Sequence, residues 1–394
     1  MRTKVKLKGG ISLIVLVITI IVMIILAAAI ILSLSNSGII SKANKAKTDS
    51  DTANLKEYVN TLRAEWELMT ADEQTAEGSF EAYANKKLEK SGYKGAVGAD
   101  GEVYSNLNEN AMAAIRAGIK VGDTVTGYTV TSTTYETSGE ENTAPSRTET
   151  DPTKQTVTTN TDITWKYLGV NANGEMEIMA SLSTTTAAAA NTKVKLSGKG
   201  GYLKGPDMLN TICEKLYSVS GVGTARSMNI EDVNNILGYT GEKGAYYDSN
   251  FNYTPTKEVK TIAALEGELG TTLDGRTTPD GKDIATYYSD DYNINKTSKN
   301  ITNSDDKTKS LVYNAKNRYW LASPCVRANF EYGYAVFFVR CVISADVRAC
   351  NMFVSDGDSY YDAYAVRPVV SLKSNIQLTQ NTEKTAWEIK QVQN

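Results

Sequence analysis

The stretch of sequence that decides the fold of this chain opens with Tyr319-Trp320-Leu321-Ala322-Ser323 and closes with Val366-Arg367-Pro368-Val369-Val370-Ser371-Leu372. Between Leu321 and Ala365 there is no Lys, Gln, Thr or Trp, although Lys and Thr are abundant elsewhere. The same window holds three of the four cysteines and four of the six phenylalanines, among many Tyr, Asp, Ser, Asn and Arg. Tyr offers a large, rigid contact area at low entropic cost, and small polar residues adapt their hydrogen bonds. The composition is therefore typical of a binding surface.

Apolar runs predict the strands that carry this window. Val336–Ile343 has the pattern of a mostly buried strand, and Val366–Leu372 that of a second, in which Pro368 needs a position without a backbone donor. Ser355–Ser359 contains turn residues, and Ala386–Val392 is expected to close the sheet. Short strands with little regular structure between them describe an irregular mixed α/β head.

The bulk composition excludes several classes of function. A net charge of −3 argues against a nucleic-acid partner. The chain has no histidine, which excludes catalytic triads built on His and most transition-metal sites. Four irregularly spaced cysteines without a C-x-x-C are too few for a disulfide framework, and Cys213 is expected to be a buried apolar residue. We expect no cofactor and no metal.

A cluster of acids at Asp280, Asp283, Asp290 and Asp291 leaves calcium binding or a solvated acidic face as alternatives. No D-x-D-x-D-G loop with a closing Glu is present, which favours the solvated face. Nucleotide binding has no support, because neither of the glycine motifs that cradle phosphates occurs.

The amino terminus predicts a membrane span. Ile11–Leu34 is free of charge, Gly and Pro, and a helix needs about 20 apolar residues to cross a bilayer. Basic residues precede it without an acid, so the short amino-terminal segment is expected in the cytoplasm and the rest outside. A cleaved secretory signal ending near Ala27-Ala28-Ala29 is the alternative, disfavoured because Ile30-Ile31-Leu32 continues the apolar run.

Beyond the span, apolar residues recur at helical spacing from Asp51 to Met69, which predicts a stalk helix with a kink or break at Ser37-Gly38. Packing of its Leu and Trp stripe against the following segment is the favoured interpretation. Further expected elements are helices over Ser79–Ser91, Asn110–Ala117, Pro206–Tyr217 and Ile230–Leu237 (capped by Asn229 and ended by Gly238), a strand over Thr124–Thr134, a hairpin over Ile163–Ala180, and surface loops with short hairpins over 241–310.

The junction Lys8-Gly9-Gly10 followed by Ile11-Ser12-Leu13-Ile14-Val15-Leu16 resembles the processing site of bacterial type IV prepilins and pseudopilins. The resemblance implies cleavage between Gly10 and Ile11 by a prepilin peptidase, and other pilins as partners. Most pilins carry Glu at the fifth mature position, where this chain has Val15. The departure argues against a major subunit and leaves a minor or tip subunit, or a membrane-anchored surface protein.

The frame YWLAS … A-x-F-F-V-R-x-V … S-x-G … AVRPVVSL is similar to that of the variable proteins of diversity-generating retroelements, whose carboxy-terminal domain has a C-type lectin fold related to formylglycine-generating enzymes. In such systems template adenines are mutated, so that AAY codons become NNY codons, which exclude Lys, Gln, Glu, Met and Trp. Glu331 and Met352 are the exceptions within the window. Thr and His, which NNY codons allow, are also absent from it.

This resemblance separates structural residues from variable ones. The structural frame comprises Trp320, Leu321, Val339, Arg340, Val342, Val347, Phe353, Ser355, Gly357, Val366, Arg367 and Pro368. The positions expected to vary and to line one solvent-facing ligand surface are Arg327, Asn329, Phe330, Tyr332, Tyr334, Cys341, Ile343, Ser344, Asp346, Arg348, Cys350, Asn351, Val354, Asp356, Asp358, Ser359, Tyr360, Tyr361, Asp362 and Tyr364. Core packing is the alternative for any single Tyr or Phe among them.

Enzymatic activity is an alternative function, because the formylglycine-type relatives include enzymes that use paired cysteines. Cys341 and Cys350 fall at variable positions and no His accompanies them, so we expect no enzymatic activity. Arg340 and Arg367 are interpreted as ion-pair partners within the scaffold, with anion binding as the alternative.

Together these patterns predict an α+β chain in which a long amino-terminal transmembrane and stalk helix precedes a C-type lectin-like head. The expected parts are a basic leader (1–10), a transmembrane helix (11–34), an extracellular stalk helix (35–75), a small α/β connecting region (76–135), a polar linker (136–162), the head (163–380) with its variable region (319–372), and a C-terminal strand (381–394). The expected function is binding of an unknown protein or glycan at a cell or phage surface, from the cell membrane or a pilus tip. A structural minor pilin or pseudopilin without a diversified face is the alternative.

Overall fold

The computed structural model describes residues 39–139, 151–182, 193–239, 246–247, 253–254, 292–293, 301–313, 318–329, 334–354 and 358–392. The expected leader with Gly10 and Ile11, the transmembrane helix and the Ser37-Gly38 break lie outside these residues. Over the described ranges, no helix combines the length and the apolar character that a membrane crossing requires. The chain divides into two compact units, the first reaching Gly95 and including Val103–Asn106, the second formed by Ala96–Glu102 and Leu107–Asn394.

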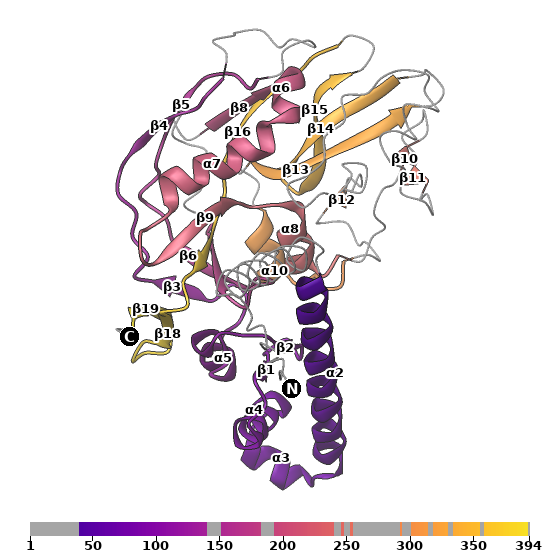
Figure 1. The fold of residues 1–394 in the computed structure, drawn as a ribbon, viewed down its shortest axis with the longest axis vertical. Coiled ribbons are helices and arrows are strands. Elements are labelled where there is room, and N and C mark those ends of the chain that lie inside the picture. The colour runs from indigo at the N-terminus through magenta and orange to yellow at the C-terminus, as the bar shows by residue number, and fades with distance from the viewer. Residues whose placement is uncertain are drawn as a thin grey trace, which may run out of the picture. The chain divides into compact units, whose positions relative to one another are not determined.

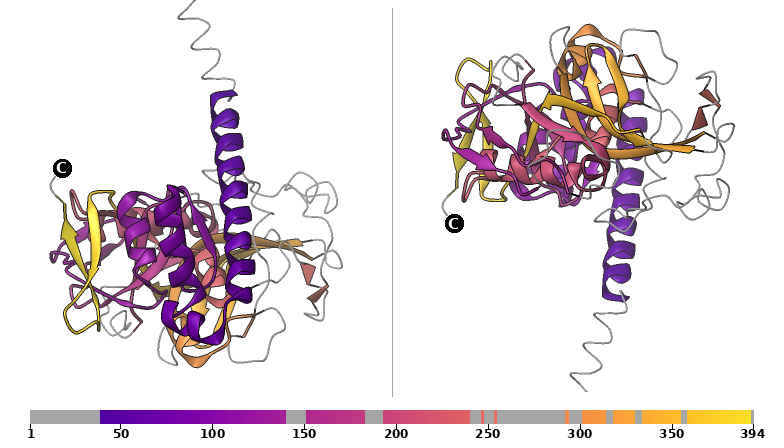
Figure 2. Two further views of the ribbon diagram at one scale, coloured as in Figure 1. Left: turned by 90° about the horizontal axis from the view of Figure 1, so that it is seen from below. Right: turned by 90° about the horizontal axis from the view of Figure 1, so that it is seen from above.

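The first unit is helical. It contains α2 (Ile39–Leu68), α3 (Ala71–Glu77) and α4 (Phe80–Ser91), and α2 runs as one unbroken helix in both views of Figure 2. Leu55, Val59 and Leu62 of α2 are buried, and Trp66 packs against two aromatic rings of α4. The predicted packing of this stripe is therefore confirmed. The helix ends at Leu68 instead of continuing to residue 75, because Thr70 forms a capping box with Glu73 that starts α3.

Side-chain caps explain why most of the predicted helices begin where they do. Ser79 accepts from the Ala82 amide at the start of α4, and Asn108 caps α5 (Glu109–Arg116). Asn229 caps α8 (Ile230–Leu237), which ends at Gly238 with a φ of 57°, as predicted. Among its described residues, the second unit also contains the helices α6 (Gly198–Leu203), α7 (Gly205–Tyr217) and α10 (Asp306–Val312).

One of these helices corrects an expectation. The polar region 241–310 was expected to hold loops and hairpins, but α10 begins inside it at Asp306. Asp305 accepts a hydrogen bond from the Thr308 amide and so caps the helix, while Val312 is buried. A single apolar turn behind a capping Asp is too short to give a periodic signal, which is why the sequence pattern missed it.

Two large sheets dominate the second unit (Figure 1). The seven-stranded sheet has the order β18-β19-β3-β6-β7-β17-β9, and the six-stranded sheet the order β12-β15-β14-β13-β16-β8. The bounds of the first are β18 (Ile376–Gln380), β19 (Trp387–Gln391), β3 (Thr124–Thr126), β6 (Trp165–Val170), β7 (Met176–Ala180), β17 (Pro368–Leu372) and β9 (Gly223–Ser227). Those of the second are β12 (Tyr292–Asn293), β15 (Asp346–Val354), β14 (Tyr334–Ile343), β13 (Arg318–Asn329), β16 (Tyr361–Ala365) and β8 (Lys193–Ser197). The protein is therefore a mixed α+β structure with several sheets.

The smaller strands refine the expected boundaries. The single strand expected over Thr124–Thr134 is in fact β3 and, after a gap, β4 (Thr134–Glu136). β4 pairs with β5 (Thr156–Thr158), so the region expected as a polar linker contributes a strand, whose central Val157 is buried. The remaining short strands are β1 (Gly95–Val97) and β2 (Val103–Ser105), where the chain passes between the units, and the pair β10 (Tyr246–Tyr247) and β11 (Tyr253–Thr254).

The carboxy-terminal hairpin β18–β19 is yellow in Figure 1 and lies at one end of the seven-stranded sheet. β19 was expected to close the sheet, but it lies between β18 and β3, so that β18 forms the edge. The predicted hairpin β6–β7 is confirmed.

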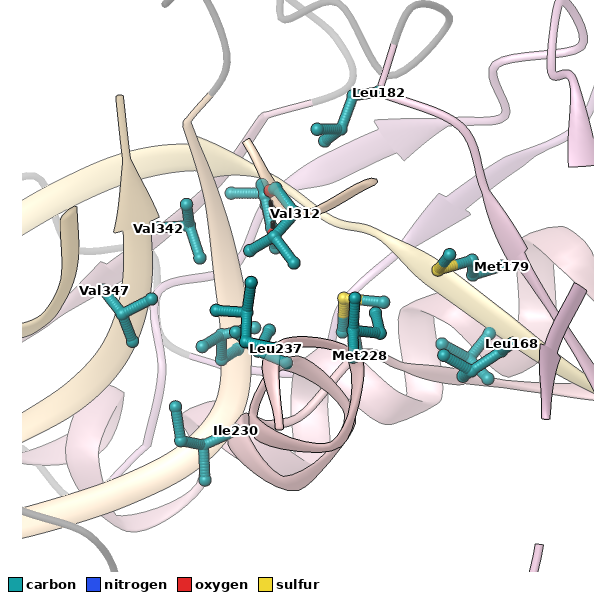
Figure 3. Packing of buried hydrophobic residues seen from close by; sticks show 14 of the residues in the cluster. Leu168, Met179, Leu182, Met228, Ile230, Leu237, Val312, Val342 and Val347 are labelled. Carbon is teal, nitrogen blue, oxygen red and sulfur yellow. Dashed lines mark hydrogen bonds between the residues drawn. The ribbon is translucent and has the colours of Figure 1, made fainter. Parts of the chain in front are cut away.

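The core joins the two sheets. Met179 of the seven-stranded sheet and Val342 of the six-stranded sheet belong to one buried cluster, which is completed by apolar residues of α8 and by Val312. Figure 3 shows Leu237 of α8 among these side chains. Because α8 and α10 contribute to the same cluster, burial of apolar surface holds the six-stranded sheet in a fixed relation to the rest of the head.

Arg367 crosses this core as a fully buried cation. Its Nε donates to the Ala180 carbonyl oxygen at 3.0 Å, and its Nη2 donates to the Leu311 carbonyl oxygen at 2.6 Å. Its Nη1 donates to the Tyr319 hydroxyl at 3.1 Å, and that hydroxyl donates to the Val312 carbonyl oxygen at 2.7 Å. Arg367 lies in the scaffold as expected, but the expected ion pair is not formed among the described residues: its partners are carbonyl oxygens, a phenol and the sulfur atoms of Met179 and Met228.

Candidate binding face of the six-stranded sheet

The hairpin β14–β15 supplies most of the positions expected to bind a ligand. Its strands pair from Val336 with Val354 to Ile343 with Asp346, and a two-residue turn, in which Ser344 has a φ of 54°, joins them. At the far end the rings of Phe337 and Phe353 stack at 4.3 Å. The backbone of the hairpin is thus fixed by register and by aromatic packing.

The residues assigned to the structural frame are buried wherever the structure describes them. These are Trp320, Leu321, Val339, Arg340, Val342, Val347, Phe353, Val366, Arg367 and Pro368. Ser355 and Gly357 lie outside the described residues. Trp320 illustrates the role, since its indole Nε1 donates to the Val194 carbonyl oxygen of β8 at 2.8 Å and thereby ties β13 to the edge of the sheet.

Cys341 and Cys350 form a disulfide between β14 and β15, with a Cα–Cα distance of 6.3 Å. Both were expected to face solvent as variable positions, and both are buried. Cys341 pairs with Arg348, and Cys350 pairs with Val339, so the two thiols lie on the same face of the sheet in a diagonal arrangement. The spacing along the sequence gave no signal for this bond, because it depends on the register of the hairpin. Cys213 is free and buried, as predicted.

The structure divides the positions expected to vary into three groups. Exposed or partly exposed side chains are those of Ile343, Ser344, Asp346, Arg348, Asn351, Asp358, Ser359, Tyr360, Tyr361 and Asp362. Buried side chains are those of Cys341, Cys350, Val354 and Tyr364, for which the expected solvent exposure is wrong. The side chains of Arg327, Asn329, Phe330, Tyr332, Tyr334 and Asp356 lie outside the described residues.

These positions do not share one face. In a strand, successive side chains point to opposite sides, and directly paired residues point to the same side. Asn351 pairs with Phe338, on the side opposite to the disulfide. Tyr361 and its neighbour Asp362 likewise point to opposite faces. The Nζ of Lys195, on β8, lies 4.7 Å from the centre of the Tyr361 ring. The expectation of a single ligand surface is therefore corrected to two faces and an edge.

The edge is made by Asp358–Tyr360, which precede β16. The Val354 amide donates to the Asp358 carbonyl oxygen, and the Tyr360 amide donates to the Met352 carbonyl oxygen, each at 2.8 Å. Tyr360 remains exposed, with its hydroxyl 3.4 Å from a carboxylate oxygen of Asp358. Backbone pairing therefore holds exposed side chains in place without burying them.

One face gathers a cluster that we call the arginine face, formed by Arg318, Arg348, Asp362 and Tyr364. Trp320 lies at its base, with its ring 4.7 Å from that of Tyr364. Burial raises the pKa of Tyr364 to about 12, and the hydrogen bond to Asp362 adds to this rise, while the charges of Arg318 and Arg348 oppose it. The sequence pattern missed Arg318, although strand alternation from Trp320 would have indicated its face.

The members of a second polar cluster are hydrogen-bonded to one another. Arg226 donates to both carboxylate oxygens of Asp232, at 2.6 and 2.8 Å, and to Glu177 at 2.9 Å. The Ser371 hydroxyl donates to Glu177 as well. These bonds join β7, β9 and β17 to α8, so the cluster has a structural role.

Metal and calcium binding find no site in the part of the chain that the structure describes, since it contains no group of three or more His, Cys, Asp or Glu placed to hold an ion. The four aspartates from Asp280 to Asp291 lie outside the described residues.

No protein-family model matches this chain, and neither does any curated protein or solved structure. Its function has to be inferred from its own residues.

Proposed function

We propose that this protein is a surface-displayed ligand-binding protein, an adhesin or receptor-binding protein. In this proposal residues 11–34 anchor it in the cell membrane with the amino terminus in the cytoplasm, a prepilin peptidase cleaves after Gly10, and the head faces outward. The head has a C-type lectin-like architecture, and a retroelement diversifies its exposed positions. It is not an enzyme.

The observation that carries the proposal is the separation of frame from exposed residues. Every described residue of the frame is buried, whereas ten of the fourteen described side chains at positions expected to vary reach solvent. Substitution at an exposed position away from special features changes stability by only about 0.5 kcal/mol. A sheet built in this way tolerates replacement of its exposed side chains, as a diversified binding surface requires.

The disulfide supports the expected location. Disulfides persist in oxidising compartments and are rare in the cytosol. A buried Cys341–Cys350 bond within the hairpin suits a head displayed outside the cell.

Two libraries of the full chain, displayed on a cell surface, test the proposal. The first randomises Ile343, Asn351, Asp358, Tyr360 and Tyr361 with NNY codons. The second treats Val339, Val342, Val347, Phe353 and Val366 in the same way. We expect the first library to keep the parental display level after heating and the second to lose most of it.

Binding is scored by selecting the first library against lysozyme as an arbitrary protein target. Recovery of binders with substitutions confined to the randomised positions supports a ligand-binding face. Equal loss of display in both libraries would rule out diversification, and a displayed library that never yields a binder would rule out ligand binding.

The genome offers an independent test of the retroelement. We expect a near copy of the codons for Tyr319–Leu372, with adenines at the variable positions, beside a reverse-transcriptase gene. Sequencing of the gene from many cells should show substitutions at the exposed positions and none in the frame. Uniform sequences with no such copy nearby would contradict diversification.

A structural pilin is the second candidate, favoured by α2, a 30-residue helix that follows the apolar segment and has Leu55, Val59 and Leu62 buried. Immunogold labelling separates the two functions. Label along the whole shaft of purified fibres supports the structural pilin, while label at tips or on the membrane supports the adhesin.

A further inference from the structure

Strand register places the two arginines of the arginine face on the same side of the six-stranded sheet. Arg318 lies two residues before Trp320 on β13, which puts both side chains on one face. Trp320 pairs with Cys341 of β14, and Cys341 pairs with Arg348 of β15. The two arginines therefore lie on either side of β14, on the strands β13 and β15, which are about 10 Å apart.

The sheet on both sides of β13 is rigid. Tyr364 is only 7% exposed, and its ring packs against Trp320, which is itself held by the hydrogen bond to Val194. A hydrogen bond between the Tyr364 hydroxyl and Asp362 helps to orient the phenol. The Cys341–Cys350 disulfide fixes the neighbouring strands. A ligand group that enters here meets a surface that has already been organised.

The exposed guanidinium groups make this face suited to an anion. Both Arg318 and Arg348 are exposed, and the ion pairs between described residues include neither of them. Asp362 and Asp346 lie on the same face, so the two arginines share it with two carboxylates. Arginine binds carboxylates through two parallel hydrogen bonds, which makes it the side chain best suited to such a group.

We propose that the arginine face binds a carboxylate group of a protein ligand, held between the guanidinium groups of Arg318 and Arg348. This inference rests on the proposed ligand-binding function and names the chemistry of its ligand. Arg318 precedes the variable window, so its charge is present in every variant, whereas Arg348 is a position expected to vary. One half of the site is then constant and the other is specific to each variant.

A protein ligand is favoured over an acidic glycan by the surroundings of the arginines. Ile343 pairs directly with Arg318 and is partly exposed beside it. Tyr360 provides exposed aromatic surface on the edge formed by Asp358–Tyr360. Arg and Tyr are the side chains that most often dominate the energy of protein interfaces.

The test uses the full-length chain in detergent micelles and a fluorescein-labelled peptide of eight glutamates, with an eight-glutamine peptide for comparison. Fluorescence anisotropy measures binding. We expect R318Q/R348Q to weaken binding of the glutamate peptide by about tenfold or more, because two charge-assisted contacts are lost. K373Q/K390Q removes the same charge at exposed lysines of the other sheet, one directly after β17 and one on β19, and should change the affinity less than about twofold.

Several outcomes overturn the inference. These are equal binding of the two peptides, an equal loss in both double variants, and no binding of the glutamate peptide at millimolar concentration. Selective, arginine-dependent binding of a hyaluronan fragment in place of the glutamate peptide would reassign the face to an acidic glycan. Thermal unfolding of R318Q/R348Q close to that of the parent excludes misfolding as the cause.

The two proposals fail separately. The libraries that test ligand binding leave Arg318 and Arg348 unchanged, so loss of the carboxylate site does not affect their result. If those libraries fail but the glutamate peptide still binds through the arginines, diversification is ruled out and the anion site remains.

Discussion

Arg367 and Arg348 lie in the same carboxy-terminal part of the chain, yet one is enclosed and the other reaches solvent. Arg367 donates to two carbonyl oxygens and a phenol in the core between the sheets. Arg348 lies on the arginine face and is exposed. The difference teaches that the surroundings of a side chain, and not its type, divide this head into a part that holds the fold and a part that is free to vary.

The largest expected effect is the loss of Arg367. Arg367→Met leaves the Ala180 and Leu311 carbonyl oxygens and the Tyr319 hydroxyl without their donor, and each buried polar group left unsatisfied costs about 1–3 kcal/mol. Arg348→Met should change the free energy of unfolding by less than about 0.5 kcal/mol. Urea denaturation measures both. Similar values for the two variants would remove the distinction between the regions.

Tyr364 and Tyr361 provide a matched pair on one strand. Tyr364 is 7% exposed and packs on Trp320, whereas Tyr361 is 59% exposed. We expect Tyr364→Ala to cost about 3 kcal/mol through the cavity it leaves, and Tyr361→Ala to cost less than about 0.5 kcal/mol. Thermal unfolding measures both losses of stability. A larger loss for Tyr361→Ala than for Tyr364→Ala would contradict the assignment of faces.

The disulfide should contribute about 2–3 kcal/mol, since it closes a loop of roughly ten residues in the unfolded chain. We expect C341A/C350A to be destabilised by that amount, and dithiothreitol to lower the unfolding temperature of the parent but not of the double variant. Thiol titration of the unfolded parent should detect only Cys213 and Cys325 before reduction. Four titratable thiols in the untreated protein would contradict the bond.

The smallest effect is a pH dependence. The pKa of Tyr364 is raised from 10.0 to about 12 in the folded state, first by burial. A raised pKa means that the unfolded chain loses this proton first, so the stabilisation is complete below pH 10 and is lost as the pH rises towards 12. We expect Tyr364→Phe to reduce the fall in stability between pH 10 and pH 11, measured by urea denaturation. An unchanged slope would show that other buried tyrosines account for the whole fall.

Local signals predicted much of the fold. Asn229 and Gly238 delimit α8 as expected, and the hairpin β6–β7 forms where alternating apolar residues flank Asn173-Gly174. Such signals act over a few residues, through a cap or a turn, so they need no knowledge of distant parts of the chain. α10 and β5 were missed because each buries a single apolar residue among polar neighbours.

The candidate site was predicted less completely. The window was recognised by its composition, and the described residues of the expected frame are buried. The buried state of Val354 and Tyr364 was not foreseen, and neither was the contribution of Arg318. Composition reports which residues are present, but it does not tell which face of a strand is covered.

The sequence by itself determined the limits of α4, α5, α7 and α8 and the strands at Val336–Ile343 and Val366–Leu372, since periodicity and capping are properties of neighbouring residues. Only the tertiary structure decided that Cys341 meets Cys350, that Arg367 is enclosed, and that Arg318 and Arg348 share a face. These relations depend on the register between strands and on the layers packed against the sheet, which are set by contacts between residues far apart in the chain.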